Sequence, residues 1–250
     1  MSFARSLIHS LKLFSHSCSS LFYPEICLHC RKDLGANGTI LFCRDCQAAC
    51  QLLDPIEHCL LCFAPLEATP SRRTACAACK QYFSCLTAKA AAFPYAGPAA
   101  SLVKSIKYQG QFYLAEGAAA LLTAQYCHLD WPMPEIITYV PSPTLRQLER
   151  GFNHSQLLAQ AVAKNLNCPC RELLARQHGS FSQANLNRKQ REALNSRHFY
   201  RKTDIDIRDK VILLIDDVTT TSRTLESCAK LLAAGFPKSI YALTLCQTIE

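Results

Sequence analysis

The clearest hydrophobic pattern in the chain is the apolar run from Val211 to Ile215, which fits one buried strand of a parallel sheet. Two acidic residues follow where this strand is expected to end, and a hydroxyl-rich turn comes after them. Residues 225–234 then have the pattern of a helix, and Gly235 stands where that helix would end. We therefore predict a strand, an acidic pair, a polar turn and a helix in direct succession.

Other segments indicate further helices and strands. Helices are predicted over 98–109, over 112–128, from the N-cap Asn153 to Asn165, and over the short basic stretch 188–195. Strands are predicted over 135–140, 172–175 and 239–246, and residues 180–187 are expected to form a polar loop. Strands that alternate with helices predict an α/β fold built on a parallel sheet.

The N-terminal segment, residues 1–26, has apolar side chains at positions 7, 8, 11 and 14, which suit an amphipathic helix. We expect this helix to pack on the part of the chain that follows. Polar residues interrupt its apolar run, so it lacks the continuous core of a signal peptide. No stretch approaches the roughly 20 apolar residues of a membrane helix. These features predict a cytoplasmic protein without a membrane span.

The composition is that of a soluble globular protein with one mid-sized domain and one small module. The chain has 250 residues, of which 49% are hydrophobic, and its mean hydropathy is near zero. Cysteine is frequent up to residue 85 and then becomes sparse. We predict an N-terminal helix over 1–26, a cysteine-rich module over 27–85 and an α/β domain over 86–250.

Eight of the 16 cysteines form four Cys-x-x-Cys pairs, separated by 12, 12 and 13 residues. Each pair supplies two thiolates from one tight turn, and two pairs complete a tetrahedral four-sulfur zinc site. The pattern is typical of a double zinc ribbon with one or two structural zinc ions. The spacing leaves open whether neighbouring or alternate pairs share a metal. The predicted ligands are Cys27, Cys30, Cys43, Cys46, Cys59, Cys62, Cys76 and Cys79.

Disulfides and a redox function are the alternatives for these pairs. Disulfides require an oxidising compartment, and the chain shows no export signal. Four pairs in tandem also fit a redox motif poorly. The other cysteines have no ligand spacing, and we expect most of them to be small buried hydrophobic residues: Cys18, Cys50, Cys85, Cys127, Cys168, Cys170, Cys228 and Cys246.

The positive charge of the chain is concentrated in one segment. Residues 146–202 contain 11 Lys and Arg residues and 3 acidic residues, a net charge of +8 that equals the charge of the whole chain. A basic tract with aromatic residues suits pyrophosphate or single-stranded nucleic acid, and a solvated basic surface is the alternative. The residues expected at a nucleic-acid interface are Arg150, Phe152, Arg176, Arg188, Lys189 and Arg191.

The acidic pair and the turn after it offer groups for a phosphorylated sugar. In open α/β sheets, ligands bind at the carboxyl ends of strands, and a helix N-terminus offers free N–H groups to a phosphate. Asp216 and Asp217 suit sugar hydroxyls, directly or through Mg²⁺ and water. The turn hydroxyls and Arg223 suit the phosphate. A buried strand whose acids merely cap the next helix is the alternative.

This run resembles the phosphoribosyl-pyrophosphate (PRPP) motif of type I phosphoribosyltransferases, in which two acids and a Thr-Thr-Gly-x-Thr-type loop follow a strand. Ser222 takes the place of the loop glycine. We expect Ser222 to narrow the space for the phosphate and Arg223 to compensate with its positive charge. The resemblance implies that the two acids would be catalytic in an active enzyme. It also implies that PRPP binds with Mg²⁺ through Asp216, Asp217, Thr219, Thr220, Thr221, Ser222, Arg223 and Thr224.

The order of short motifs resembles the ComF family of competence-associated proteins over nearly the full length of the chain. The motifs are Lys107-Tyr108-Gln109-Gly110, Val140-Pro141-Ser142-Pro143 and Arg150-Gly151-Phe152-Asn153, followed by Gln183, Leu186 and Arg191. The asparagine that follows this arginine in the family is displaced by one position, to Asn195. The turn after strand 135–140 takes the place of the pyrophosphate loop, which adds Ser142, Arg146 and Arg150 to the predicted PRPP site.

The resemblance leaves three functions open. The one we favour is the handling of incoming single-stranded DNA during natural transformation, with PRPP or a nucleic-acid phosphate at the turn. The second is a Mg²⁺-dependent phosphoribosyltransferase that transfers ribose 5-phosphate from PRPP to a nucleobase or similar acceptor, although no clear residue for recognising a base is evident. The third is a PRPP-sensing scaffold whose zinc ribbons dock a protein partner in DNA uptake.

Overall fold

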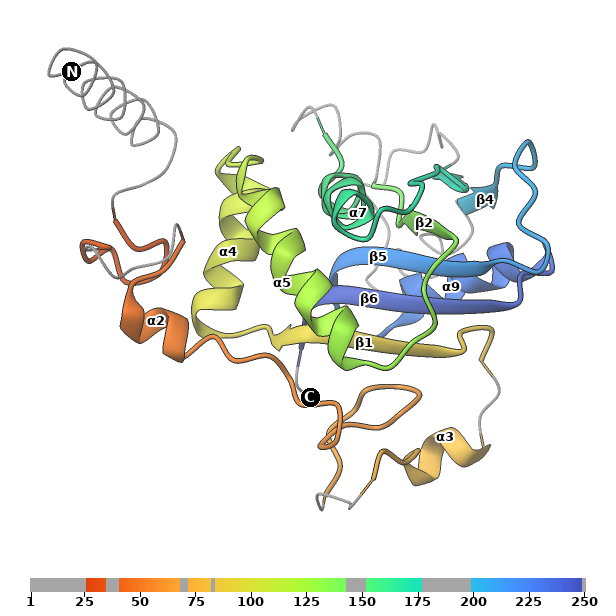
Figure 1. Cartoon of the computed structure of the whole chain (residues 1–250), viewed down its shortest axis with the longest axis horizontal. Helices are drawn as coiled ribbons and strands as arrows, with labels where there is room; N and C mark the ends of the chain where they lie inside the picture. The colour runs from red at the N-terminus through yellow and green to blue at the C-terminus, as the bar shows by residue number, and fades with distance from the viewer. Residues whose placement is uncertain are drawn as a thin grey trace, which may run out of the picture.

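Within the residues that the structure describes, a parallel four-stranded sheet forms the centre of the molecule (Figure 1). The computed structural model describes residues 26–34, 41–67, 72–81, 84–142, 152–176 and 199–248. The strands are β1 (Ala88–Pro94), β2 (Ile136–Tyr139), β5 (Val211–Thr219) and β6 (Ser239–Gln247), in the spatial order β1-β6-β5-β2. Each neighbouring pair in this sheet is parallel, so the predicted fold class is confirmed.

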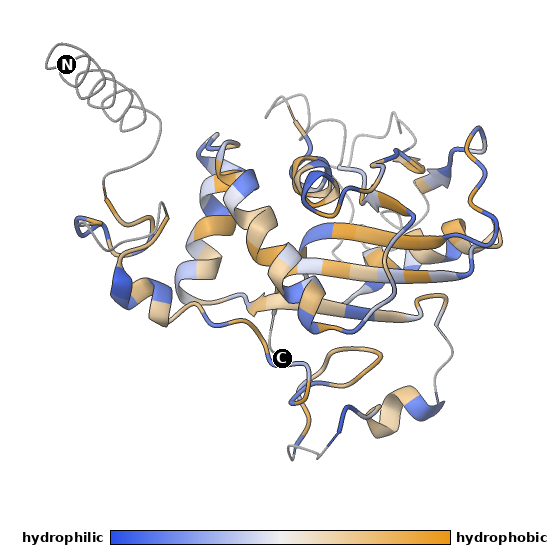
Figure 2. Ribbon diagram, viewed as in Figure 1, coloured by the Kyte–Doolittle hydropathy of each residue, from blue (hydrophilic) through white to orange (hydrophobic). Residues whose placement is uncertain are grey.

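Helices cover both faces of this sheet. The helices α4 (Gly97–Tyr108), α5 (Leu114–His128) and α7 (His154–Asn165) pack on one face, and α9 (Arg223–Ala233) packs on the other. Figure 1 shows α5 in front of the sheet and α9 behind it. Alternate side chains of a strand point to opposite faces, so Leu213 and Ile215 join one core and Ile212 and Leu214 the other. Figure 2 shows β5 as hydrophobic along most of its length, as a strand covered on both faces requires.

Most elements predicted for the α/β domain are present. The helices α4, α5, α7 and α9 lie at the predicted places, and β2, β3 (Leu174–Arg176) and β6 match the predicted strands with small shifts at their ends. The predicted polar loop over 180–187 and basic helix over 188–195 lie outside the described residues.

The strand β5 is longer than predicted: the sequence pattern ends it before the acidic pair, and the structure does not. It continues through Asp216 and Asp217 to Thr219 and stays paired with β6, where Asp216 lies opposite Thr244 and Thr219 opposite Gln247. The long neighbouring strand supplies backbone partners that the apolar run alone does not indicate. The two acids therefore occupy regular strand positions, and their side chains leave the strand on opposite faces.

The hydrophobic pattern does not predict β1 or β4 (Phe199–Arg201). Residues 88–92 of β1 are mostly alanine, which has a low strand propensity, and pairing with β6 makes this segment a strand. The strand β4 has only three residues and pairs antiparallel with β3 in a separate two-stranded sheet. Such a short segment shows no usable period in the sequence.

The cysteine-rich segments lie beside the edge strand β1. They contain the short helices α2 (Arg44–Ala48) and α3 (Ala77–Gln81). The Leu53 N–H donates to the Ala92 carbonyl at 2.9 Å, and the Lys89 N–H donates to the Leu61 carbonyl at 2.9 Å. These bonds satisfy backbone groups that an edge strand would otherwise expose.

The boundaries of the three predicted domains remain predictions. Residues 1–25 of the predicted N-terminal helix lie outside the described residues. Among the helices that the structure describes, none has the length and apolar character needed to cross a membrane.

Candidate functional site

The side chains of Asp216 and Asp217 contact different helices. Asp217 faces α4, where Lys107 Nζ lies 2.8 Å from Asp217 Oδ1. Only 20% of the Lys107 side chain and 16% of the Asp217 side chain are exposed, so water screens this ion pair weakly. Asp216 contacts the N-terminus of α7, where Ser155 Oγ donates a 2.7 Å hydrogen bond to Asp216 Oδ1. The acidic pair thus links β5 to two helices.

Hydrogen bonds extend from Asp216 into two of the short sequence motifs. Asn153 is the N-cap of α7, as predicted, and its Oδ1 accepts a 3.1 Å bond from the Ser155 N–H. The same oxygen accepts a 2.7 Å bond from Ser142 Oγ, and Asn153 Nδ2 donates to the Val140 carbonyl at 3.1 Å. The end of β2, the start of α7 and the acidic pair therefore form one connected network.

The half-buried Asp216 carboxyl has a shifted protonation equilibrium. Burial, followed by the negative charge of Asp217, raises the pKa of Asp216 from 3.8 to about 7. Hydrogen bonds from Ser155 Oγ and from the Asp217 N–H, at 2.7 and 2.9 Å, oppose this shift. Near neutral pH, Asp216 can therefore donate a hydrogen bond to a ligand as well as accept one.

The turn after β5 enters α9 through a residue with left-handed backbone geometry. Ser222 is the N-cap of α9 and has a φ of 57°, a conformation that costs a residue other than glycine about 1–2 kcal/mol. Glycine at this position of the PRPP motif would adopt it without strain. The Ser222 side chain makes no capping hydrogen bond to α9. A helix N-terminus whose cap residue makes no such bond suits an anion.

A lysine of β1 adds positive charge to this turn. Lys89 Nζ donates a hydrogen bond to Ser222 Oγ, and the lysine is half-buried. Arg223, the residue predicted to supply charge here, is exposed at the first position of α9. The turn is therefore flanked by a cation from β1 in addition to the predicted one.

The structure brings together part of the predicted PRPP site. Asp216, Asp217 and Ser142 belong to the hydrogen-bond network and ion pair described above, and residues 219–224 form the adjoining turn and the start of α9. The remaining two predicted residues, Arg146 and Arg150, lie outside the described residues.

The predicted nucleic-acid residues are only partly described, because Arg150, Arg188, Lys189 and Arg191 lie outside the described ranges. Phe152, next to the cap of α7, packs edge-on against Phe112 of the turn before α5, with ring centroids 5.6 Å apart. Phe112 is 56% exposed. Arg176 stacks on the Phe199 ring at 5.2 Å in the two-stranded sheet. Of the predicted set, Phe152 and Arg176 are therefore described, and they lie on different elements.

Three residues of the site are not evident from the sequence. Lys107 belongs to a matched motif, but the motif gives it no role. Ser155 and Lys89 belong to no motif. Their contacts arise because α4, α7 and β1 meet the strand and turn of the acidic pair, which depends on the order of strands in the sheet.

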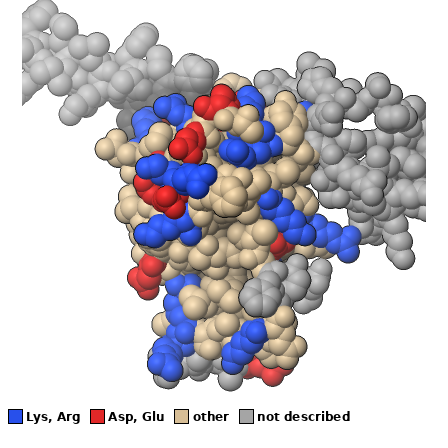
Figure 3. Space-filling model, turned by 90° about the vertical axis from the view of Figure 1, so that its right-hand side faces the viewer, with Lys and Arg blue, Asp and Glu red and all other residues tan. Residues whose placement is uncertain are grey.

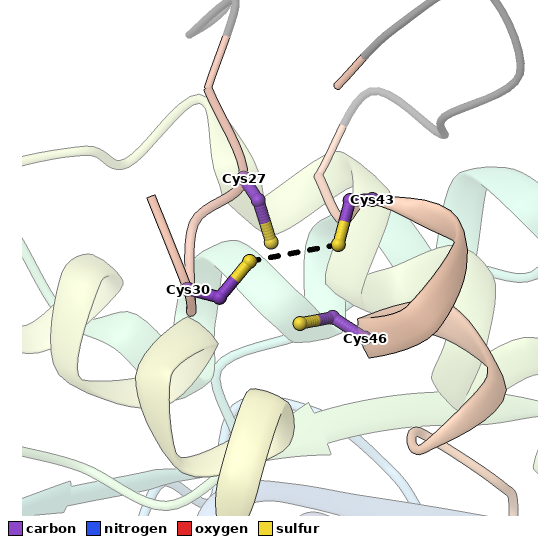
Figure 4. Close-up of side chains that lie close together, drawn as sticks. All are labelled: Cys27, Cys30, Cys43 and Cys46. Carbon is purple, nitrogen blue, oxygen red and sulfur yellow. Dashed lines mark hydrogen bonds between the residues drawn. The ribbon is translucent and has the colours of Figure 1, made fainter. Parts of the chain in front are cut away.

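The ligand cysteines gather into two four-sulfur clusters, and in each cluster the sulfur atoms lie within 4.8 Å of one another. Figure 4 shows Cys27, Cys30, Cys43 and Cys46 pointing toward a common centre. Cys30 Sγ lies 3.6 Å from Cys43 Sγ, and Cys62 Sγ lies 3.8 Å from Cys76 Sγ in the other cluster. Sulfurs bound at about 2.3 Å to a tetrahedral zinc ion lie about 3.8 Å apart. Both clusters therefore fit zinc, and neighbouring pairs share each site.

In each cluster, backbone groups support the thiolate form of one cysteine, whereas burial and the neighbouring thiols raise the pKa of Cys46, Cys62 and Cys79. Although burial opposes it, N–H groups of Cys30, Cys43 and His29 lower the pKa of Cys27 to about 6. Cys59 Sγ accepts from the Cys76 N–H at 3.2 Å and from the Leu61 N–H at 3.4 Å, and its pKa is also lowered to about 6 against the effect of burial. Zinc binds the thiolate, so these turns are suited to metal binding.

The expectation that most of the remaining cysteines are buried is wrong for the described ones. Cys228 and Cys246 are buried, whereas Cys85 and Cys127 are exposed and the others are half-buried. The exposed pair lies in a connecting segment and in the last turn of α5, where the apolar pattern does not apply.

Sequence comparison finds similarity to a domain family and to individual proteins. A family model described as phosphoribosyl transferase domain matches residues 153–250. Competence protein F of Haemophilus influenzae is 27% identical over 220 residues, which cover 84% of this chain and 92% of that protein. DNA utilization protein YhgH of Escherichia coli K12 is 27% identical over 160 residues, which cover 62% of this chain and 70% of that protein.

The chain also aligns with solved phosphoribosyltransferase structures. A hypoxanthine-guanine phosphoribosyltransferase of Bacillus anthracis aligns with a TM-score of 0.38 and 14% identity, covering 54% of this chain and 70% of that one.

Proposed function

Because this chain belongs to the ComF family, as a homologue of competence protein F and DNA utilization protein YhgH, we propose that it is a cytoplasmic protein of DNA utilization. It binds single-stranded DNA during uptake in natural transformation. Its phosphoribosyltransferase fold serves to hold the phosphate of PRPP or of a nucleic-acid end.

The observation that carries this proposal is the convergence of four separate sequence motifs on one site. The Lys-Tyr motif reaches the acidic pair through the ion pair of Lys107, and the Val-Pro and Phe-Asn motifs reach it through Ser142 and Asn153. The PRPP motif itself supplies the acids and the turn. A structural role for the acids alone, such as capping α9, would not require the other three motifs.

We assign a distinct place in this proposal to each part of a phosphorylated ribose. The phosphate would bind the N-terminus of α9, with the side chains of residues 219–224 and Lys89 around it. The sugar hydroxyls would bind Asp216 and Asp217. The diphosphate of PRPP would lie toward Ser142 and Lys107.

The donor set at the acidic pair suits Mg²⁺ held together with a phosphorylated ligand. Carboxylate oxygens and water are the ligands that Mg²⁺ prefers, and one or two carboxylates with substrate phosphates commonly suffice. Asp216 and Asp217 would hold the ion or its water shell. When bound, the ion would offset phosphate charge next to the two carboxylates.

Single-stranded DNA would be held through its backbone and its bases. The exposed Phe112 and its neighbour Phe152 offer faces for base stacking beside the site. Arg150, Arg176, Arg188, Lys189 and Arg191 would contact the backbone. The zinc ribbons support the fold along β1 in this proposal, since four cysteine ligands leave no open metal position for chemistry.

The test compares the wild type with Asp217→Asn. We expect calorimetry to show Mg²⁺-PRPP binding that weakens at least tenfold in the variant, since a hydroxyl bond to a charged acceptor is lost. Asp204→Asn is the matched control, because Asp204 is exposed in the segment before β5. Fluorescence polarisation should show binding to single-stranded DNA that falls steeply with salt.

Two results would overturn the proposal. One is the absence of single-stranded DNA binding at low salt by folded, zinc-replete protein. The other is pyrophosphate release from PRPP that depends on one nucleobase and is lost in Asp217→Asn, which would establish an active phosphoribosyltransferase instead.

A further inference from the structure

We propose that the protein binds single-stranded DNA by its 3′ end: the 3′-terminal nucleotide occupies the acidic-pair site, and the preceding nucleotide lies in a cleft between α9 and the second cysteine cluster. This inference rests on the proposed function and adds a direction to it. We call this space the ribbon cleft, and the lining residues that matter here are Leu61, Lys80, Lys89, Thr221, Ser222 and Lys230.

The ribbon cleft has the size and position of a nucleotide site. Its volume is about 740 Å³, within the range of about 300–1,000 Å³ found for small-molecule sites. One wall comes from the second cysteine cluster and the other from α9. Thr221 and Ser222 line it as well, so the cleft adjoins the phosphate turn directly.

The polar groups of the ribbon cleft suit a phosphodiester. Three lysines line it, from α3, β1 and α9: Lys80, Lys89 and Lys230. Within the described part of the chain, none of the three forms an ion pair with a carboxylate. Glu226 also lines the cleft, but both of its oxygens accept hydrogen bonds from Ser84 Oγ, at 2.8 and 2.9 Å. Lys80 and Lys230 therefore have no described carboxylate partner, and Lys89, which donates to Ser222 Oγ, has further N–H donors for a ligand.

The cleft offers apolar surface next to these charges. Leu61 of the second cysteine cluster lines the cleft and is 36% exposed. A nucleobase has an apolar face that could cover it. Figure 3 shows Lys and Arg side chains, with Asp and Glu side chains among them, both on the larger upper body of the molecule and on the smaller lower lobe.

The direction follows from the order of groups in a nucleotide. In the proposed site, the sugar lies on Asp216 and Asp217 and its 5′-phosphate lies on the turn. In a DNA strand this phosphate joins the sugar to the preceding nucleotide, which must leave the site on the far side of the turn. Thr221 and Ser222 line the ribbon cleft, whereas Asp216 and Asp217 do not, so we assign the preceding nucleotide to the cleft. The remaining hydroxyl of this deoxyribose is the 3′-OH, which would contact Asp216 and Asp217. A free 3′-OH means that the bound nucleotide is the last of the strand.

The first experiment uses the full-length, zinc-loaded protein and oligonucleotides labelled at the 5′ end. One oligonucleotide ends in a 3′-OH and a matched one in a 3′-phosphate. We expect the 3′-phosphate to weaken binding about tenfold, because a hydrogen bond to charged groups is lost and a second anion faces the acids. This comparison changes only the DNA, so folding of a variant cannot confuse it.

The second experiment tests the cleft with Lys80→Ala and Lys230→Ala, each made separately because Lys80 follows a metal ligand. Each variant should lower the salt slope of single-stranded DNA binding by about 0.7, the value for one lost phosphate contact. Lys238→Ala is the matched control, since Lys238 is exposed just before β6, at the other end of the sheet from the turn.

The outcomes separate this inference from the proposed function. Equal affinity for both 3′ ends, or unchanged salt slopes in both cleft variants, would overturn the inference while single-stranded DNA binding still stood. Absence of any single-stranded DNA binding would overturn the proposed function as well. A tenfold preference for the 3′-OH together with reduced slopes would support both.

Discussion

Lys107 of α4 and Asp217 of β5 form an ion pair, with Lys107 Nζ 2.8 Å from Asp217 Oδ1 and both side chains mostly shielded from water. The pair joins a residue of the Lys-Tyr motif to the second acid of the PRPP motif. Removing one partner should leave a poorly solvated charge, which is costly.

The first prediction concerns the energy of this pair. We expect Lys107→Ala and Asp217→Asn each to lower the free energy of unfolding, and the double variant to lose less than the sum of the two. The coupling should be about 1 kcal/mol, because the pair is only partly exposed. Urea unfolding of the four proteins measures it. Strictly additive losses would show that the pair contributes no energy of its own.

The second prediction concerns pH. The folded-state pKa of Asp216 lies above its ordinary value of 3.8, so the stability that this group contributes is present at low pH and lost as pH rises toward 7. Asp216→Asn keeps an oxygen that can accept from Ser155 and cannot ionise. Relative to the wild type, its Tm should therefore rise by at least about 2 °C between pH 5 and pH 8. A Tm difference that does not change with pH would contradict the assignment.

The third prediction concerns metal content. We expect two zinc ions per chain, and Cys43→Ser should remove one of them while the cluster of Cys59 stays loaded. Cys127→Ser, at an exposed cysteine outside both clusters, is the control and should keep both ions. Elemental analysis gives the count. Full zinc content in Cys43→Ser would refute this pairing of the cysteines.

The fourth prediction concerns the left-handed residue at the phosphate turn. Ser222→Gly should raise the free energy of unfolding by about 0.5–1 kcal/mol, since the strain of a φ of 57° exceeds the entropy that glycine adds to the unfolded chain. Ser227→Gly, within α9, should lower it by a similar amount. Thermal unfolding compares them, and a loss of stability in Ser222→Gly would mean that the bond from Lys89 outweighs the strain.

Elements with a strong local pattern could be predicted from the sequence. The apolar run before Asp216, the N-cap Asn153 and the Cys-x-x-Cys pairs each carry their own signal, because the physical cause lies within a few residues. The alanine-rich β1 and the continuation of β5 through Asp216 depend instead on pairing with β6. Propensity alone cannot reveal such long-range partners.

The same distinction holds for the candidate site. The acids and the hydroxyl-rich turn are contiguous, so a motif describes them. The contacts of Lys107, Ser155 and Lys89 bring together residues from different elements, and the choice between neighbouring and alternate cysteine pairs also required the fold.

Competition between PRPP and DNA tests the central claim most directly, because the claim places both ligands at one turn. Mg²⁺-PRPP would be titrated into a complex of the protein with labelled single-stranded DNA, followed by polarisation, at PRPP concentrations that calorimetry shows to be saturating. We predict that PRPP displaces the DNA, and that Asp217→Asn requires more PRPP to do so. Retention of all the DNA at saturating PRPP would contradict the claim of a shared site.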